Sequence, residues 1–241
     1  MKKTFAILVG ICLVVLNTGC FDIVEEVFLN KDGSGKYLMT MDMSGLLKDS
    51  FMKEMMKEEM KGDLGSDLME KDTVIYFKDV PETVELSDED KKILENLQMR
   101  LSMSEKKAEM LIKLQLDFKN VTDINKMSEV MSKIGADQQV SSGMPGGNLM
   151  TGNNASFSFK KGLLSRLPVK MSDAVKADES MEMMKMFLGD ADYKTIYHLP
   201  GKVKKVDIPG AVIDGKTVTV TNRMLDMLDG KAKIDGAIKF K

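Results

Sequence analysis

Apolar and polar residues alternate over most of the chain after residue 22, a pattern typical of half-buried β-strands. Residues 23–29 and 36–43 alternate on either side of the segment Asn30-Lys31-Asp32-Gly33-Ser34-Gly35. Asp-Gly and Ser-Gly steps suit the positive φ angles of a tight turn, so this region predicts a β-hairpin. In its second strand, Tyr37, Met39, Met41 and Met43 are expected to share one face.

The same pattern predicts strands further along the chain. The clearest pair is 97–103 and 109–119, with a turn at 104–107, and Asp214-Gly215-Lys216 indicates another hairpin. The remaining expected strands are 73–78, a strand from Phe157, 193–199, 202–206, 211–213, 217–220 and 232–240.

Helical periodicity and capping residues predict the helices. Ser44 is the expected N-cap of a helix over 45–61, and Ser87 with the acidic residues after it opens a short helix. Thr122 or Asp123 is expected to cap a helix to about residue 134. Further helices are expected over 178–188 and directly after Asn222, the expected cap.

Together these elements predict an α+β fold, with a mainly antiparallel sheet built from hairpins and helices packed on it. We expect a signal peptide over 1–19 and a single α+β mature domain over 20–241. Residues 20–134 and 156–241 are possible halves of that domain. Residues 135–155 are rich in Gly, Ser, Asn and Gln and predict a flexible loop between them.

The first twenty residues have a different character. A basic start, Met1-Lys2-Lys3, precedes an almost wholly apolar run over 5–16 and the junction Thr18-Gly19-Cys20. The apolar run is too short for a membrane-spanning helix but suits a signal peptide. The segment resembles a bacterial lipoprotein signal, which implies that Cys20 is lipidated and becomes the new N-terminus. Asn17 departs from the family pattern, which usually has Leu there, while Leu16 lies one position earlier.

The layout of the body also resembles lipoproteins of unknown function from Bacteroides-type bacteria. Cys20, the 30–35 hairpin, and the segments 199–203 and 214–218 carry this resemblance. It implies export from the cytoplasm and a membrane contact through the lipid anchor. Because Phe21 and not Asp follows the cysteine, the outer membrane is favoured over the inner membrane by analogy with the enterobacterial sorting rule.

Charge and cysteine content narrow the function further. Loss of Lys2 and Lys3 with the signal changes the formal net charge from −2 to −4, so no nucleic-acid partner is predicted. The chain has two cysteines, Cys12 in the signal and Cys20 at the lipid site, which leaves no thiol for a disulfide or thiolate metal site.

Methionine is unusually frequent, with 23 residues. Clusters at 52–60 and 181–186 could supply thioether ligands for Cu(I). However, Met52, Met56 and Met60 recur every four residues, as the apolar stripe of an amphipathic helix does. Packing, or an apolar groove for a partner, is therefore preferred over a metal site.

Catalytic signatures are weak. His198 is the only histidine, and no nucleotide-binding, nucleophile-elbow or zinc-protease motif occurs. We therefore expect no catalytic residues, metal site or cofactor, and a non-enzymatic binding or envelope-associated module with a possible envelope protein partner. The alternatives are a Met-rich carrier of metal or an apolar ligand, and a hydrolase that uses acidic residues.

Overall fold

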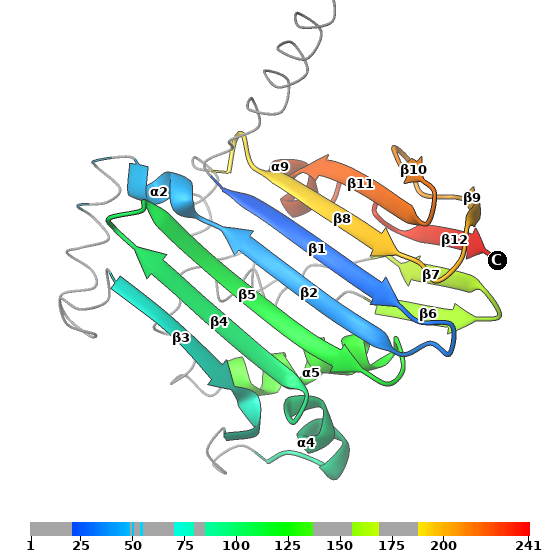
Figure 1. Ribbon diagram of the computed structural model, residues 1–241, viewed down its shortest axis with the longest axis horizontal. Helices are drawn as coiled ribbons and strands as arrows, with labels where there is room; N and C mark the ends of the chain where they lie inside the picture. Colours follow the sequence, from blue (N-terminus) through cyan, green and yellow to red (C-terminus); the bar gives the residue numbers. More distant parts are fainter. Residues whose placement is uncertain are drawn as a thin grey trace, which may run out of the picture.

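The computed structural model describes residues 21–48, 50, 54, 70–79, 85–136, 156–168 and 188–241. Within these residues the chain is mostly β, with two sheets and short helices (Figure 1). An eight-stranded sheet has the strand order β10-β11-β8-β1-β2-β5-β4-β3, and a four-stranded sheet has the order β6-β7-β12-β9. The strands of the larger sheet are β1 (Asp22–Leu29), β2 (Gly35–Asp42), β3 (Glu70–Tyr76), β4 (Leu97–Ser104), β5 (Glu109–Phe118), β8 (Asp192–His198), β10 (Val212–Asp214) and β11 (Thr217–Arg223). Those of the smaller sheet are β6 (Ser156–Lys160), β7 (Leu163–Leu167), β9 (Val203–Val206) and β12 (Gly236–Phe240).

The α+β expectation was wrong. The described helices are too few and short to form a layer of their own: α2 (Ser44–Lys48), a 3₁₀ turn (Phe77–Asp79), α4 (Asp88–Leu94), α5 (Asp123–Ala136) and α9 (Met224–Leu228). The larger sheet is also mixed, because β1 pairs antiparallel with β2 but parallel with β8. A second sheet, and not helices alone, covers part of its inner face.

The first hairpin confirms the predicted alternation. Along β1, every second side chain from Ile23 to Leu29 is buried, and in β2 Tyr37, Met39 and Met41 are buried too. The turn holds Gly33 at φ 91°, as expected for Asp-Gly. The pairs β4–β5 and β10–β11 are likewise antiparallel hairpins, as predicted.

Four local expectations need correction. Ser44 opens α2, but its Oγ accepts from the Met110 backbone N–H (3.1 Å) and so ties α2 to β5. Asn222 belongs to β11, and α9 begins after Arg223 without a side-chain cap. The last strand begins at Gly236 rather than at 232. Residues 135 and 136, expected in a loop, are the end of α5; the rest of 135–155 lies outside the described residues.

Strand β7 was not predicted. Its sequence, Leu-Leu-Ser-Arg-Leu, does not alternate, and the turn before it holds Lys161 and Gly162 at φ 49° and 74°. Two successive positive φ angles are the signature of the primed turns that close two-residue hairpins. Lysine rarely adopts this conformation, so the sequence Lys-Lys-Gly does not indicate a hairpin.

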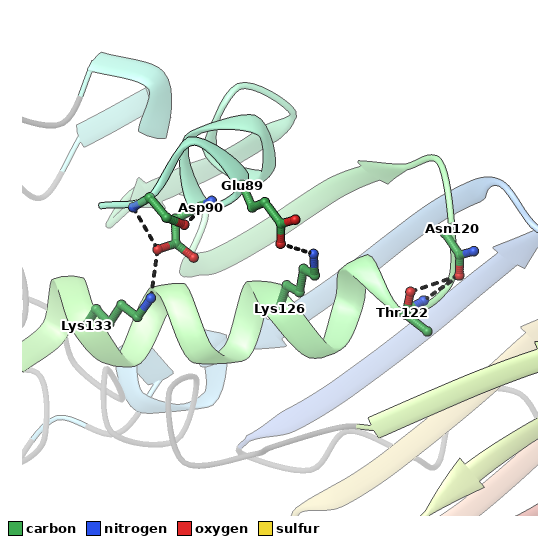
Figure 2. Close-up of polar contacts among 7 residues, drawn as sticks. Glu89, Asp90, Asn120, Thr122, Lys126 and Lys133 are labelled. Carbon is green, nitrogen blue, oxygen red and sulfur yellow. Dashed lines mark hydrogen bonds and ion pairs between the residues drawn. The ribbon is translucent and has the colours of Figure 1, made fainter. Parts of the chain in front are cut away.

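Helix α5 lies behind the larger sheet beside the four-stranded sheet (Figure 1). Asn125 joins α5 to β6: its Nδ2 donates to the Phe157 carbonyl (3.0 Å), and its Oδ1 accepts from the Phe157 N–H (2.6 Å). Two ion pairs hold α4 on α5, Lys126–Glu89 (2.5 Å) and Lys133–Asp90 (2.7 Å), as Figure 2 shows. Helix and small sheet therefore cover adjoining parts of one sheet face.

Lys241, directly after β12, fits against Gly201 with no space for a side chain. A Cβ atom at Gly201 would lie 1.6 Å from the Lys241 carbonyl oxygen. Gly201→Ala should lower the free energy of unfolding by about 1–3 kcal/mol, because backbone and not a flexible side chain must move. Urea unfolding measures the loss.

Gly189→Ala is the matched control, because a Cβ there would meet nothing within 4 Å. Its effect should stay within about 0.5 kcal/mol. Equal stability of the two variants would contradict the close approach at Gly201.

Candidate functional site

A buried ion pair joins the two sheets. Glu25 of β1 and Arg166 of β7 form a salt bridge with side chains 0% and 1% exposed. Arg166 Nη1 donates to Glu25 Oε2, the same oxygen that accepts from Tyr193 (3.0 Å) and Thr195 (3.1 Å). Glu25 Oε1 accepts from the Tyr37 hydroxyl (3.1 Å). One carboxylate thus collects four donors from four different positions of the core.

The positions of these residues follow from strand alternation. Glu25 lies between Ile23 and Val27 on the inward face of β1, where a charged residue needs a partner. Tyr193, Thr195 and Tyr197 occupy the inward positions of β8, and β8 pairs directly with β1. Sequence analysis missed the cluster, although a glutamate at an inward position and one of only three arginines within an apolar strand were usable signals.

Arg166 is only partly satisfied by hydrogen bonds. Nη1 makes two longer contacts besides Glu25, to Thr195 Oγ1 and the Tyr197 hydroxyl, both 3.4 Å. Among the described residues, its Nε and Nη2 have no hydrogen-bond partner. The guanidinium lies over the Phe157 ring, 5.2 Å from its centroid, which offers a cation–π contact. Because buried charges are costly, this arrangement depends on the Glu25 carboxylate.

The electrostatics of the cluster keep its phenols neutral. Burial first, and then the Glu25 charge, raise the pKa of Tyr37 and Tyr193 well above the usual tyrosine range. Burial also raises the pKa of Tyr197. Burial, the largest single effect, acts to lower the pKa of Arg166, but the Glu25 charge together with Tyr197 and Tyr193 outweighs it and raises that pKa. The cluster is therefore a fixed pair of opposite charges inside a shell of neutral donors.

The closed geometry of this cluster suits a structural role. Neither charged side chain reaches solvent, and the bonds of Glu25 to Arg166 and to Tyr193 join elements distant in sequence. It orients β7 on β1 and β8, because slipping β7 by one residue would turn Arg166 to the opposite face. We therefore treat it as the element that fixes the two sheets on each other.

His198 lies outside this cluster, on the outer face of the large sheet. Its ring stacks on Phe28 with centroids 4.1 Å apart, and its Nε2 lies 3.0 Å from Glu26 Oε1. Its side chain is 34% exposed. The structure thus gives the lone histidine one carboxylate and one aromatic neighbour. Within the described part of the chain, no three His, Cys, Asp or Glu side chains group as metal ligands would.

Three aspartates form a row at the start of β1. Asp22 is paired with Asp42 of β2 and with Asp192 of β8, and Asp192 is paired with Arg223 of β11. Burial first, and then the charges of Asp192 and Asp42, raise the pKa of Asp22. We call Asp22, Asp42 and Asp192 the aspartate row.

Several residues singled out in the sequence lie outside the described residues: Cys20, Met52, Met56, Met60 and the 181–186 cluster. Met39, Met41, Met99 and Met110, which belong to neither cluster, are buried in the core. No helix among the described residues is long and apolar enough to cross a membrane.

Comparisons with known proteins add little. No protein-family model matches the chain, and no curated protein matches its sequence. Among solved structures, the chain is similar to the folded domain of LppM from Mycobacterium tuberculosis, determined by NMR. The TM-score is 0.42 and the identity 9%, over 94% of this chain and 92% of that chain.

Removing one partner of the buried pair should be strongly destabilising. Arg166→Met leaves the Glu25 carboxylate buried without its cation and should cost about 3–5 kcal/mol of unfolding free energy. The double variant Glu25→Gln with Arg166→Met should recover part of this loss, because no buried charge then remains. Urea unfolding of both single variants and the double variant measures the coupling.

The exposed bidentate pair Arg100–Asp72 provides the control, with side chains 54% and 56% exposed. Arg100→Met should cost far less stability than Arg166→Met, because water screens the pair. Additive losses at Glu25 and Arg166 would show that the two residues do not act together.

The raised pKa of Asp22 predicts that the stability effect of replacing it depends on pH. Because the pKa of Asp22 is raised in the folded state, the folded state favours the protonated side chain. This favourable contribution to stability is lost as the pH rises through the folded-state pKa. Asp22→Asn should therefore raise stability at pH 7 by less than about 1 kcal/mol, since the side chain is partly exposed. The gain should vanish below the unfolded pKa of aspartate, about 4.

Asp32 is the control with the opposite sign. Hydrogen bonds from the Ser34 hydroxyl and backbone lower its pKa, so Asp32→Asn should reduce stability at pH 7 and lose its effect as pH falls. Unfolding midpoints at neutral and acidic pH measure both variants. A loss of stability at pH 7 in Asp22→Asn would contradict the raised pKa of Asp22.

Proposed function

We propose that this chain is a lipid-anchored exported lipoprotein whose body is a non-enzymatic binding or envelope-associated module. The sequence support is the basic start, the short apolar run over 5–16 and the Gly19-Cys20 junction. In this proposal Cys20 carries the lipid, and the folded body begins at the next residue.

The start of the buried fold at the residue that follows Cys20 in the sequence is the observation that carries the proposal. Phe21 is 4% exposed, and β1, a central strand of the large sheet, begins at Asp22. One residue spans at most about 3.6 Å, so a lipid on Cys20 would be joined to the core without a linker. The start of β1 and the aspartate row beside it would then face the anchoring membrane.

The interior supports a binding rather than a catalytic role. The most strongly perturbed side chains, those around Glu25 and Arg166, are sealed from solvent and bonded to one another. Perturbed ionisable groups mark catalytic sites when they line a cleft, but structural ion-pair networks perturb pKa values too. Here the buried polar groups hold the two sheets together. A binding partner would therefore contact the surface of the protein.

Replacement of the lipid-bearing cysteine tests the anchor. Cys20→Ser should abolish metabolic labelling of the protein with palmitate and shift it from the detergent phase to the aqueous phase on partitioning. The reason is that serine lacks the thiol that forms the thioether with lipid. Labelling is measured by autoradiography after immunoprecipitation.

Cys12→Ser is the matched control, because it removes the other cysteine, within the apolar run. Labelling of this variant should equal that of the unchanged protein. Undiminished labelling of Cys20→Ser would overturn the anchor.

A further inference from the structure

Lysines from four separate segments meet at one end of the molecule. The segments are 160–162, 201–207, 214–216 and 239–241, and hydrogen bonds hold them together: Phe240 N to Gly162 O (2.9 Å), Lys241 N to Lys202 O (3.1 Å) and Val203 N to Gly215 O (3.2 Å). They contain eight lysines and two aspartates, in a chain whose formal net charge is −2. We call these segments the lysine end.

The strand register places some of these lysines side by side. On the four-stranded sheet, Lys160 is paired with Leu163, Leu163 with Lys239, and Lys239 with Lys205. Paired residues project from the same face, and all four side chains are exposed. Their neighbours along the strands, Leu164 and Ile238, are buried against the large sheet. A row of three lysines and one leucine therefore faces outward.

Such a row is unfavourable for the isolated fold. Like charges directly opposite each other destabilise a sheet, yet Lys239 and Lys205 are paired in this way. Lys205 has a carboxylate neighbour, Asp207 (2.8 Å). Within the described residues, Lys160, Lys204 and Lys239 have no ion-pair partner. Local rules of this kind are broken most often where a surface has a function.

We propose that the lysine end binds an anionic lipid bilayer. Lysines are flexible point charges that suit headgroup phosphates, and the row includes an exposed leucine, Leu163, 41% exposed. Exposed Val212 and Ile213 lie on β10, directly before the 214–216 turn. The lysine end contains no arginine that could bind a phosphate through two hydrogen bonds, and no exposed aromatic ring on which a base could stack. Both features disfavour a nucleic acid as the ligand.

The orientation of β1 makes this bilayer a different one from the anchoring membrane. β1 and β8 run parallel from the aspartate row toward the lysine end, where the four-stranded sheet lies near their arrowheads (Figure 1). Eight strand residues span roughly 26 Å. A lipid at Cys20 would hold the acidic end at its own membrane and direct the lysine end away from it. Only this orientation rests on the proposed function; charge-dependent lipid binding does not.

The test is a vesicle-bridging experiment with the lipidated full-length chain. The protein is inserted into donor vesicles of phosphatidylcholine and mixed with labelled acceptor vesicles of equal parts phosphatidylcholine and phosphatidylglycerol. We expect donors to recruit anionic acceptors and not purely phosphatidylcholine acceptors, with recruitment falling as ionic strength rises above ~0.15 M. Replacing the row by Lys160→Gln, Lys205→Gln and Lys239→Gln should lower recruitment at least about tenfold.

The control variant carries Lys92→Gln, Lys106→Gln and Lys107→Gln, which make the same change in net charge at exposed positions elsewhere. It should recruit acceptors like the unchanged protein, and urea unfolding should show that both triple variants remain folded. Equal recruitment by the row variant, or no recruitment by the unchanged protein, overturns the inference. Tighter row-dependent binding to soluble polyglutamate or to DNA than to vesicles would replace the bilayer by that polyanion and overturn it too.

Flotation of the protein with its donor vesicles is scored first, so that failure of the anchor is recognised separately. A chain that does not float with phosphatidylcholine contradicts the lipid anchor. The same chain is then mixed directly with acceptor vesicles, and its dependence on the lysine row still decides whether the lysine end binds anionic lipid.

Discussion

The ion pair between Glu25 and Arg166 is the interaction on which the rest of the architecture depends. A carboxylate and a guanidinium withdrawn from water are stable only together and only when further donors surround them. Tyr37, Tyr193 and Thr195 supply those donors from strands on either side of β1. The pair therefore selects one arrangement of the two sheets, since other registers would leave a buried charge alone.

Strand β1 connects this interior to both ends of the molecule. Its inward positions carry Glu25 and the apolar core, and its first residue belongs to the aspartate row. Its far end leads to the hairpin at Gly33, whose backbone lies against Phe159 of the small sheet. Acidic charge thus gathers at the start of β1 and basic charge at the opposite end, although the chain as a whole is nearly neutral. The two ends of β1 therefore lie in regions of opposite charge.

Local signals predicted much of the secondary structure but not its assembly. Alternation identified β1, β2, β4 and β5, because each has one face in the core and one toward solvent. It failed at β7, where Lys161 adopts a turn conformation that lysine seldom takes. It also misjudged the fold class, because the parallel pairing of β1 with β8 joins segments that lie more than 160 residues apart. Periodicity reports which face a residue occupies, not which strand lies beside it.

The sequence by itself determined the properties that depend on neighbouring residues. These are the lipoprotein-like start that predicts an anchor at Cys20, the glycine turns, and the inward methionines of β2. Only the tertiary structure decided the partner of Glu25, the acidic row at Asp22 and the lysine row at Lys239. The physical reason is that charges act through space: residues dispersed along the chain interact strongly only after sheet pairing brings them within a few ångströms. The positions of these residues in the sequence do not give the distance between their charges in the folded protein.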